Sequence, residues 1–410
     1  MMLDFTRWAV TWQRWRVPRT APPTIKEGEV VIGYGEGAVP IIWPAPSPVR
    51  ASHGLVFSAS GTGKTQMFAA ATAAEFCLSD CPLEKRHALL GVDGKGDYIK
   101  AFLSGVAALR PERLVDVRVL DPFAALPFAF NLKHLARGGN TPLEVRSLGL
   151  ANLAATVSTG VGTQAHLGAG SRQIDVIQNC LLAPLASPDP RASPLWALDG
   201  LIIPQGLKCL AAITDSERAK QFLLSAQLSE ELRASCAGRL RLALAASESL
   251  ERMMSAPTCV QFSELLGPGR ACLVDLGRPT GGLSVLTRFF ANLIVRLAVE
   301  YLLERPSPYP GHHVRLFADE AHLIVPILSD CCEAIETTGR SRNVSLALCT
   351  QSPVLLDEAS DSLVPVLLGN TPFKVIGRMD MPSAVVCTLY TRHIAPPLRS
   401  AKPSIYGSAS

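Results

Sequence analysis

The sequence lacks the long apolar runs and the regular cysteine spacing that mark membrane proteins and disulfide-rich or zinc-binding proteins. No run reaches the ~18 apolar residues of a membrane span, because the strongest candidate, 289–303, is broken by Arg296 and Glu300. The N-terminus has no apolar core followed by a small-residue cleavage site, which argues against a signal peptide. The eleven cysteines form no paired C-x-x-C sets, so we expect reduced thiols. These absences predict a cytoplasmic protein that reaches the inner membrane only through a partner or through its first helix.

Signatures of nucleic-acid binding are also scarce. The net charge is only +4, and there is no helix-turn-helix pattern, zinc-ligand set or long basic run. DNA binding is not thereby excluded, since a few basic side chains that line a pore are enough to hold a phosphate backbone. Lys95, Lys100 and Arg278 follow predicted strands and are candidates, although each is more simply a surface charge near a nucleotide site. A content of 48% hydrophobic and 18% charged residues over 410 residues predicts one large or two ordinary globular domains.

Two segments precede the first strand of the α/β pattern, which begins at residue 54. In residues 1–20, Trp8, Trp12 and Trp15 share one face of a predicted helix that also carries four arginines. This helix either packs on its own domain or docks on a partner or an anionic membrane surface. Residues 21–50 are rich in proline and glycine and predict a small hairpin.

Strands and helices alternate in two separate parts of the chain, 21–138 and 263–394. The predicted strands are 54–58, 87–92, 114–120, 271–276, 314–318, 344–350 and 373–377. The predicted helices are 64–78, 97–109, 284–303, 321–338 and a short one from Met381. This alternation indicates an α/β fold with a mostly parallel sheet, whose ligands bind at the carboxyl ends of the strands.

Residues 139–262 show helical segments and no convincing strand. The predicted helices are 141–157, 171–185, 215–226 and 229–253. The start of the third resembles a capping box formed by Thr214 and Glu217. We therefore predict an all-α domain inserted into the α/β domain. The tail, 395–410, is rich in proline, serine and alanine and is expected to be disordered.

Residues 58–65, called the P-loop below, have the composition of a phosphate-binding loop. They follow an apolar strand and open a helix, which is the context that such a loop requires. Glycines let the backbone N–H groups turn toward phosphate oxygens, and the helix N-terminus favours an anion. A serine stands at the first position, where a glycine is usual. The predicted ATP-binding residues are Ser60, Gly61, Thr62, Gly63, Lys64 and Thr65, with the Thr65 hydroxyl also a ligand of Mg²⁺.

Polar residues follow two of the predicted strands in the second α/β part of the chain: an acidic pair follows one strand and a glutamine follows the next. Asp319 and Glu320 follow the strand 314–318, where the first acid would organise Mg²⁺ and the second would polarise the attacking water. The alternative is a strand that runs into a helix with Asp319 as its N-cap. Gln351 follows the strand 344–350 and could hydrogen-bond the γ-phosphate and the water.

Arg340 and Arg342 lie in the turn before the strand 344–350. An arginine in such a turn can stabilise the γ-phosphate of a neighbouring subunit, but two solvated turn arginines would give the same pattern.

Five segments, in this order, resemble the FtsK/HerA-type motor ATPases, and most closely the type IV coupling proteins of conjugative DNA transfer, the TraG/TraD-like group. The segments are 53–57 before the P-loop, 93–97, Asp121-Pro122 with Asn131-Leu132, 319–321, and Gly339-Arg340 leading to 350–353. The similarity extends over residues 28–392 and includes a helical insertion. It implies a RecA-like P-loop NTPase fold, ATP and Mg²⁺ as cofactors, and a homo-hexameric ring with the nucleotide between subunits.

The resemblance also implies partners and residue roles. The expected partners are DNA, bound without sequence preference, and relaxase or secretion-channel proteins. By this resemblance, Lys64 would bind ATP, Thr65 and Asp319 would bind Mg²⁺, and Glu320 would be the catalytic base. Gln351 would sense the γ-phosphate. Arg340 would stabilise the charge of a neighbouring subunit's nucleotide, and Arg342 is the second candidate for that role.

Several departures indicate a diverged member. Coupling proteins usually begin with two transmembrane helices, which have no counterpart in this sequence. A proline is missing from both the 93–97 and the 131–132 elements, and residues 1–50 are too short for the small β-barrel of HerA proteins.

We therefore predict an ATP-hydrolysing ring motor that translocates DNA or a protein–DNA complex. One alternative is an adaptor whose ATP binding drives assembly and whose helical insertion binds a protein substrate. Another is an ATPase of viral packaging or DNA repair, since the same core serves those roles.

Overall fold

The computed structural model describes residues 30–34, 40–43, 53–77, 84, 86–121, 129–130, 133, 142–157, 170–245, 248–257, 260–277, 285–352, 354–356, 363–371 and 373–376. The predicted N-terminal helix 1–20, the Asn131-Leu132 element, the short helix from Met381 and the tail 395–410 lie outside these residues.

Seven parallel strands form the central sheet, in the order β5–β6–β4–β7–β8–β3–β9. The strands are β3 (Gly54–Phe57), β4 (Ala88–Asp93), β5 (Val117–Leu120), β6 (Ala271–Asp275), β7 (Val314–Asp319), β8 (Val344–Thr350) and β9 (Phe373–Ile376). The strands β4, β7 and β8 are buried along their whole length, as expected for parallel strands that are covered on both faces. This arrangement confirms the predicted α/β fold with a mostly parallel sheet. The predicted hairpin is also present, as the antiparallel pair β1 (Val30–Tyr34) and β2 (Pro40–Trp43).

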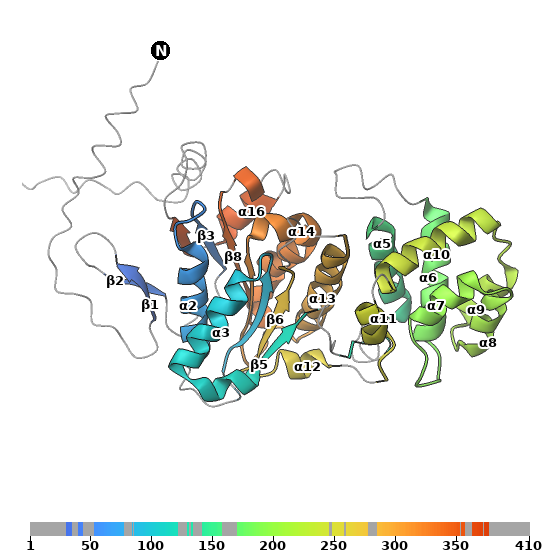
Figure 1. The fold of residues 1–410 in the computed structure, drawn as a ribbon, viewed down its shortest axis with the longest axis horizontal. Helices are drawn as coiled ribbons and strands as arrows, with labels where there is room; N and C mark the ends of the chain where they lie inside the picture. Colours follow the sequence, from blue (N-terminus) through green and yellow to red (C-terminus); the bar gives the residue numbers. More distant parts are fainter. Residues whose placement is uncertain are drawn as a thin grey trace, which may run out of the picture.

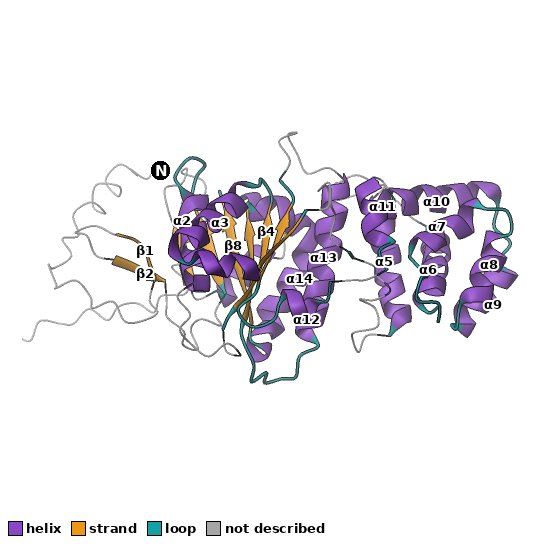
Figure 2. Ribbon diagram, turned by 60° about the horizontal axis from the view of Figure 1, so that its bottom comes forward, coloured by secondary structure: helices purple, strands orange, loops and turns teal. Residues whose placement is uncertain are grey.

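Helices cover both faces of this sheet (Figures 1 and 2). On one face lie α2 (Lys64–Cys77) and α3 (Asp97–Leu109), which pack on the sheet through three aromatic side chains. The ring centroid of Phe317 lies 4.6 Å from that of Tyr98 and 5.7 Å from that of Phe68. A Cβ at Gly91 would lie 2.3 Å from the Phe317 ring, so only glycine fits beside it. On the other face lie α13 (Val285–Leu303) and α14 (Ala321–Thr338).

A group of helices lies at one end of the molecule, beyond α13 (Figure 1). It comprises α5 (Leu143–Val157), α6 (Ser171–Leu185), α7 (Leu195–Ile202), α8 (Gly206–Ile213), α9 (Glu217–Ser225), α10 (Glu230–Leu244) and α11 (Glu248–Met254). Arg146 of α5 and Glu304, which directly follows α13, form an ion pair at 3.4 Å between Nη2 and Oε1. The helices also share one hydrophobic cluster with α13 and the sheet. A separate domain with boundaries at 139 and 262 therefore stays a prediction.

Several local predictions are wrong, for reasons that are visible in the structure. The single helix predicted over 229–253 is divided at Ala245, which has non-helical dihedral angles and ends α10. The N-cap of α9 is Ser216 and not Thr214, because the Ser216 hydroxyl accepts the hydrogen bond from the Ala219 N–H. Residues 114–116, predicted as strand, belong to the 3₁₀ helix η4 (Pro111–Asp116), which begins at a proline. Four helices were not predicted individually, although the first two lie in the region 139–262 that was predicted to be helical: α7, α8, α12 (Phe262–Leu265) and α16 (Leu363–Asn370).

Within the described residues, no helix combines the length and the apolar character that crossing a bilayer requires. Nor does a disulfide join two cysteines among them.

A buried ion pair fastens α2 to the sheet at the amino end of β7. Arg315 Nη1 lies 2.8 Å from Glu75 Oε2, and the two side chains are only 4% and 0% exposed. Removing one member of such a pair leaves an uncompensated buried charge. We therefore expect Arg315→Met to lower the free energy of unfolding by about 3 kcal/mol, measured by urea denaturation. The double variant Glu75→Gln, Arg315→Met should recover most of that loss, and a fully stable Arg315→Met would show that the pair is dispensable.

Candidate active site

The P-loop lies between β3 and α2, at the edge of the sheet where the strands end. The residues from Ser60 to Gly63 are exposed. Gly61 and Gly63 have φ values of 76° and 80°, in the left-handed region that favours glycine. The loop therefore has the curled backbone, open to solvent, that presents N–H groups to an anion at the start of a helix.

Ser58, the departure from the usual pattern, ties the loop together. Its hydroxyl lies 2.6 Å from Thr62 Oγ1, and Thr62 in turn donates to the Ala59 carbonyl at 2.7 Å. The Ser58 N–H donates to the Thr350 carbonyl on the neighbouring strand at 3.1 Å. The serine thus adds a side-chain hydrogen bond across the turn, and the loop keeps its shape.

The acidic pair faces the P-loop from the end of β7. Thr65 Oγ1 donates to Asp319 Oδ2 at 2.9 Å, and Lys64 Nζ donates to Glu320 Oε1 at 3.1 Å. Gln351, which follows the next strand, donates its Nε2 proton to Glu320 Oε2 at 3.0 Å. The fold therefore brings five of the predicted site residues together from three different segments of the chain.

Glu320 has an unusual backbone conformation that supports a functional role. Its φ of 52° lies in the left-handed region, although it is not a glycine. It is the N-cap residue of α14, yet its carboxylate makes no capping hydrogen bond and instead accepts one from Lys64. The alternative in which Asp319 caps the helix is thus wrong. Strained residues of this kind concentrate at functional sites.

Two residues of the candidate site, Lys95 and His322, were not assigned to it from the sequence. Lys95 Nζ donates to Glu320 Oε1 at 2.7 Å, so this lysine, predicted to be a DNA contact or a surface charge near a nucleotide site, belongs to the candidate site. His322 Nδ1 lies 3.2 Å from Thr350 Oγ1 and 3.5 Å from Glu320 Oε2. Their positions depend on β4 and β8 both being neighbours of β7, an order that a sequence does not reveal.

The two acids differ in their electrostatic environment. Burial raises the pKa of Asp319, and the charge of Lys64 with the Thr65 hydrogen bond offsets only part of this effect. Burial also acts to raise the pKa of Glu320, but the Lys95 hydrogen bond and the charge and hydrogen bond of Lys64 outweigh it, so the pKa is lowered. Burial lowers the pKa of His322, which favours a neutral imidazole at pH 7.

The oxygens near the P-loop suit Mg²⁺. Asp319 Oδ1 is buried, and no N–H or O–H donor among the described residues reaches it. The Thr65 hydroxyl lies beside the other oxygen of the same carboxylate. Hydroxyl and carboxylate oxygens are the hard ligands that Mg²⁺ prefers, usually together with substrate phosphates. Thr65 and Asp319 are therefore the residues that would hold the ion, directly or through water.

The two arginines lie apart from this constellation. Arg340 is exposed on the 3₁₀ helix η6 (Gly339–Arg342), at the amino end of β8, whereas the site lies at its carboxyl end. The length of the strand separates them by roughly 20 Å. Arg342 Nη1 donates to the carbonyls of Leu303 and Arg305 at 2.8 and 3.2 Å, which fastens η6 to the end of α13. Within one chain, neither arginine contributes to the site.

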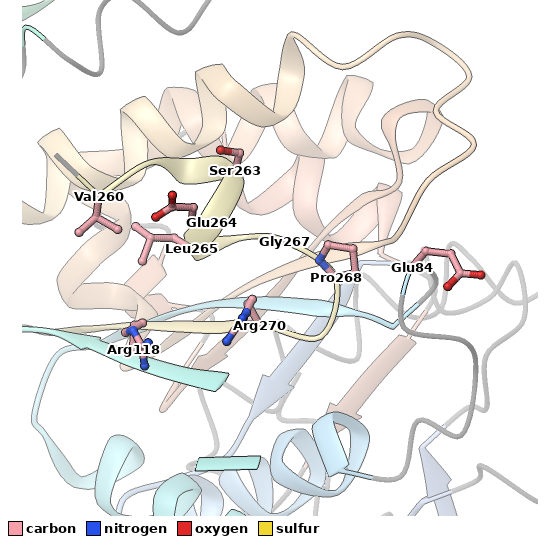
Figure 3. A pocket seen from close by; sticks show the side chains of 9 residues that line it. All are labelled: Glu84, Arg118, Val260, Ser263, Glu264, Leu265, Gly267, Pro268 and Arg270. Atoms are coloured by element: carbon pink, nitrogen blue, oxygen red, sulfur yellow. The ribbon is translucent and has the colours of Figure 1, made fainter. Parts of the chain in front are cut away.

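A cavity of about 610 Å³ lies away from the P-loop, at the amino edge of the sheet (Figure 3). Arg118 of β5 and Arg270 before β6 lie on one side of it, facing Ser263 and Glu264 of α12. Arg270 already pairs with Asp116 at 2.7 Å, and Arg118 donates to backbone carbonyls. The mixed charges and internal partners give this cavity no evident ligand.

No protein-family model and no curated protein matches the sequence. Solved structures do match: the bacterial conjugative coupling protein TrwBdeltaN70, with a TM-score of 0.55 at 16% identity, covers 87% of this chain and 75% of its own. VirB4 of Thermoanaerobacter pseudethanolicus has a TM-score of 0.57 at 15% identity, with 90% and 88% covered. TrwB in complex with the non-hydrolysable ATP analogue ADPNP has a TM-score of 0.50 at 15% identity, with 84% and 72% covered. The chain therefore has the RecA-like P-loop fold that the coupling protein TrwB and VirB4 share.

Proposed function

We propose that this chain hydrolyses ATP and uses the reaction to move DNA, or a protein–DNA complex, through a ring of identical subunits. The observation that carries the ATPase activity is the convergence of Lys64 and Gln351 on Glu320, beside the contact between Thr65 and Asp319. Three further features at the same place are not expected of an ion pair that is merely structural. They are the left-handed backbone of Glu320, the buried Asp319 Oδ1 that no N–H or O–H donor among the described residues reaches, and the solvent-exposed glycine loop.

The geometry suggests how hydrolysis proceeds. The P-loop N–H groups and Lys64 hold the β- and γ-phosphates, and Gln351 orients a water molecule. The water oxygen attacks the γ-phosphorus, the bond from that phosphorus to the β–γ bridging oxygen breaks, and ADP and phosphate form. Glu320 accepts the proton that the water releases. Mg²⁺, when bound by Thr65 and Asp319, supplies positive charge to the phosphate oxygens.

The translocation part of the proposal depends on the fold and on Arg340. The structures with the same fold include a conjugative coupling protein and VirB4. Arg340 is exposed at the edge of the sheet opposite the P-loop, where it can reach the nucleotide of a neighbouring subunit if subunits pack head to tail, as they do in a ring. The partners proposed are sequence-independent DNA and relaxase or secretion-channel proteins, which would also bring the protein to the inner membrane.

An ATPase assay with and without DNA tests this proposal. We expect the purified protein to hydrolyse ATP and DNA to raise turnover severalfold, because a motor couples hydrolysis to movement along its substrate. Lys64→Ala should abolish both the basal and the stimulated rate, since the loop then lacks its phosphate-binding charge. Lys220→Met, which changes an exposed lysine of α9, should alter neither. ATP turnover that is unaffected by single- or double-stranded DNA would contradict translocation and favour the adaptor.

A further inference from the structure

Lys95 makes a contact that the mechanism above does not use. Its ammonium lies 2.7 Å from Glu320 Oε1, and Lys64 lies 3.1 Å from the same oxygen. Gln351 donates to the other oxygen, Oε2, which His322 also approaches at 3.5 Å. Both oxygens of the catalytic carboxylate are therefore engaged. In this arrangement Glu320 cannot readily accept a proton from water, so hydrolysis requires the lysines to leave Oε1.

The backbone that carries Lys95 is fixed, whereas its side chain is not. Asp93 Oδ1 accepts hydrogen bonds from the N–H groups of Lys95 at 2.9 Å and Gly96 at 2.8 Å, and Oδ2 accepts one from Ile99 at 2.9 Å. In the sheet, Asp93 is paired with Asp319, so this turn is held next to the acidic pair. The Lys95 side chain is nevertheless 45% exposed, against 5% for Lys64. It can move while the turn stays in place.

The charges and the geometry favour movement of the Lys95 ammonium from Glu320 to a terminal phosphate. The two ammonium groups converge on a single oxygen, beside the loop in which the phosphates would lie. A γ-phosphate carries more negative charge than a carboxylate and offers several acceptor oxygens, and it would also compete for Lys64. Lysine is a point charge on a flexible stem, so it can change partners without the planar geometry that an arginine requires.

We propose that Lys95 is a γ-phosphate-sensing lysine. Without a terminal phosphate it pairs with Glu320, and with a nucleoside triphosphate in the P-loop it moves to the γ-phosphate and releases Glu320 Oε1 to accept the proton of the attacking water. A nucleoside diphosphate lacks that phosphate and leaves the pair with Glu320 intact. Lys95 thus distinguishes ATP from ADP in the same site, and this inference rests on the proposed ATPase activity.

Lys95→Met tests the inference, because it removes the ammonium and keeps most of the apolar stem. Affinities for ADPNP and for ADP, each with Mg²⁺, are measured by titration calorimetry. We expect the affinity for ADPNP to fall about tenfold and that for ADP to change less than about twofold, since only the triphosphate loses a charge-assisted hydrogen bond. In steady-state kinetics, KM for ATP should rise, and kcat should fall because the reacting γ-phosphate loses the positive charge of Lys95.

Two further variants sharpen the result. Lys95→Arg keeps the positive charge and should restore part of the preference for ADPNP over ADP, which loss of a merely structural contact would not predict. Lys220→Met should bind both nucleotides like the wild type. Circular dichroism and thermal melting confirm that each variant is folded, and Lys95→Gln replaces Lys95→Met if the latter is not.

The outcomes separate this inference from the proposed function. Equal losses of affinity for ADPNP and ADP in Lys95→Met, or none for either, would refute γ-phosphate sensing while leaving the ATPase activity in place. Failure of the ATPase proposal has a different signature, in which the wild-type protein does not hydrolyse ATP, or Lys64→Ala and Glu320→Gln both hydrolyse it at the wild-type rate.

Discussion

Replacing Glu320 by glutamine is expected to lower ATP turnover about 10³-fold, while ATP binding remains within about twofold of the wild type. Glutamine keeps the shape of the side chain, and its amide oxygen can still accept the hydrogen bonds of Lys64 and Lys95. It cannot act as a carboxylate base toward the attacking water. Single-turnover hydrolysis and calorimetric titration with ADPNP measure the two effects separately.

A matched control keeps this result specific. Glu231→Gln makes the same chemical change on the exposed first turn of α10 and should leave both turnover and binding unchanged. Full turnover in Glu320→Gln would show that another group accepts the proton. A parallel loss of ATP binding would instead show that Glu320 holds the nucleotide site together and that its contacts with the lysines are structural.

The sheet and the P-loop could be predicted because their signals are local. Buried parallel strands are short apolar runs, and the predicted strands 87–92, 314–318 and 344–350 end within one residue of the observed strand ends at Asp93, Asp319 and Thr350. The P-loop is recognisable because glycines, a lysine and a threonine stand in a fixed order between a strand and a helix. Such features depend on a few consecutive residues and need no knowledge of the tertiary structure.

The contacts within the site could not be predicted in the same way. Lys95 reaches Glu320 because β4 lies beside β7, and His322 reaches Thr350 because β8 lies on the other side. Strand order is set by how helices cross over the sheet, which a single sequence does not state. The short helices α7 and α8 were missed for a different reason, since each has only eight residues and they are separated by a turn that contains Pro204 and the left-handed Gln205.

The second large effect is expected at Arg340. Because this arginine lies at the opposite end of β8 from its own P-loop, we expect its guanidinium to act on the nucleotide of a neighbouring subunit in the proposed ring. Arginines that serve in trans typically accelerate phosphoryl transfer by about 10³-fold or more, so Arg340→Ala should lower turnover by about that factor. Nucleotide binding and folding should be retained, since the side chain is exposed. Turnover, ADPNP affinity and thermal melting of the pure variant measure these three properties.

Mixing two inactive variants distinguishes action in trans from a remote structural effect. In a mixture of Arg340→Ala and Lys64→Ala subunits, a site on an Arg340→Ala subunit has an intact Lys64 and receives an intact Arg340 from a Lys64→Ala neighbour. Random assembly in equal amounts makes about a quarter of the interfaces complete in this way, so activity should return where neither variant alone has any. The control is Arg340→Ala mixed with the double variant Arg340→Ala, Lys64→Ala, in which no complete interface can form. If mass measurements confirm mixed oligomers and activity still does not return at any ratio, Arg340 does not act across an interface, and the exposed position of η6 then has no catalytic explanation.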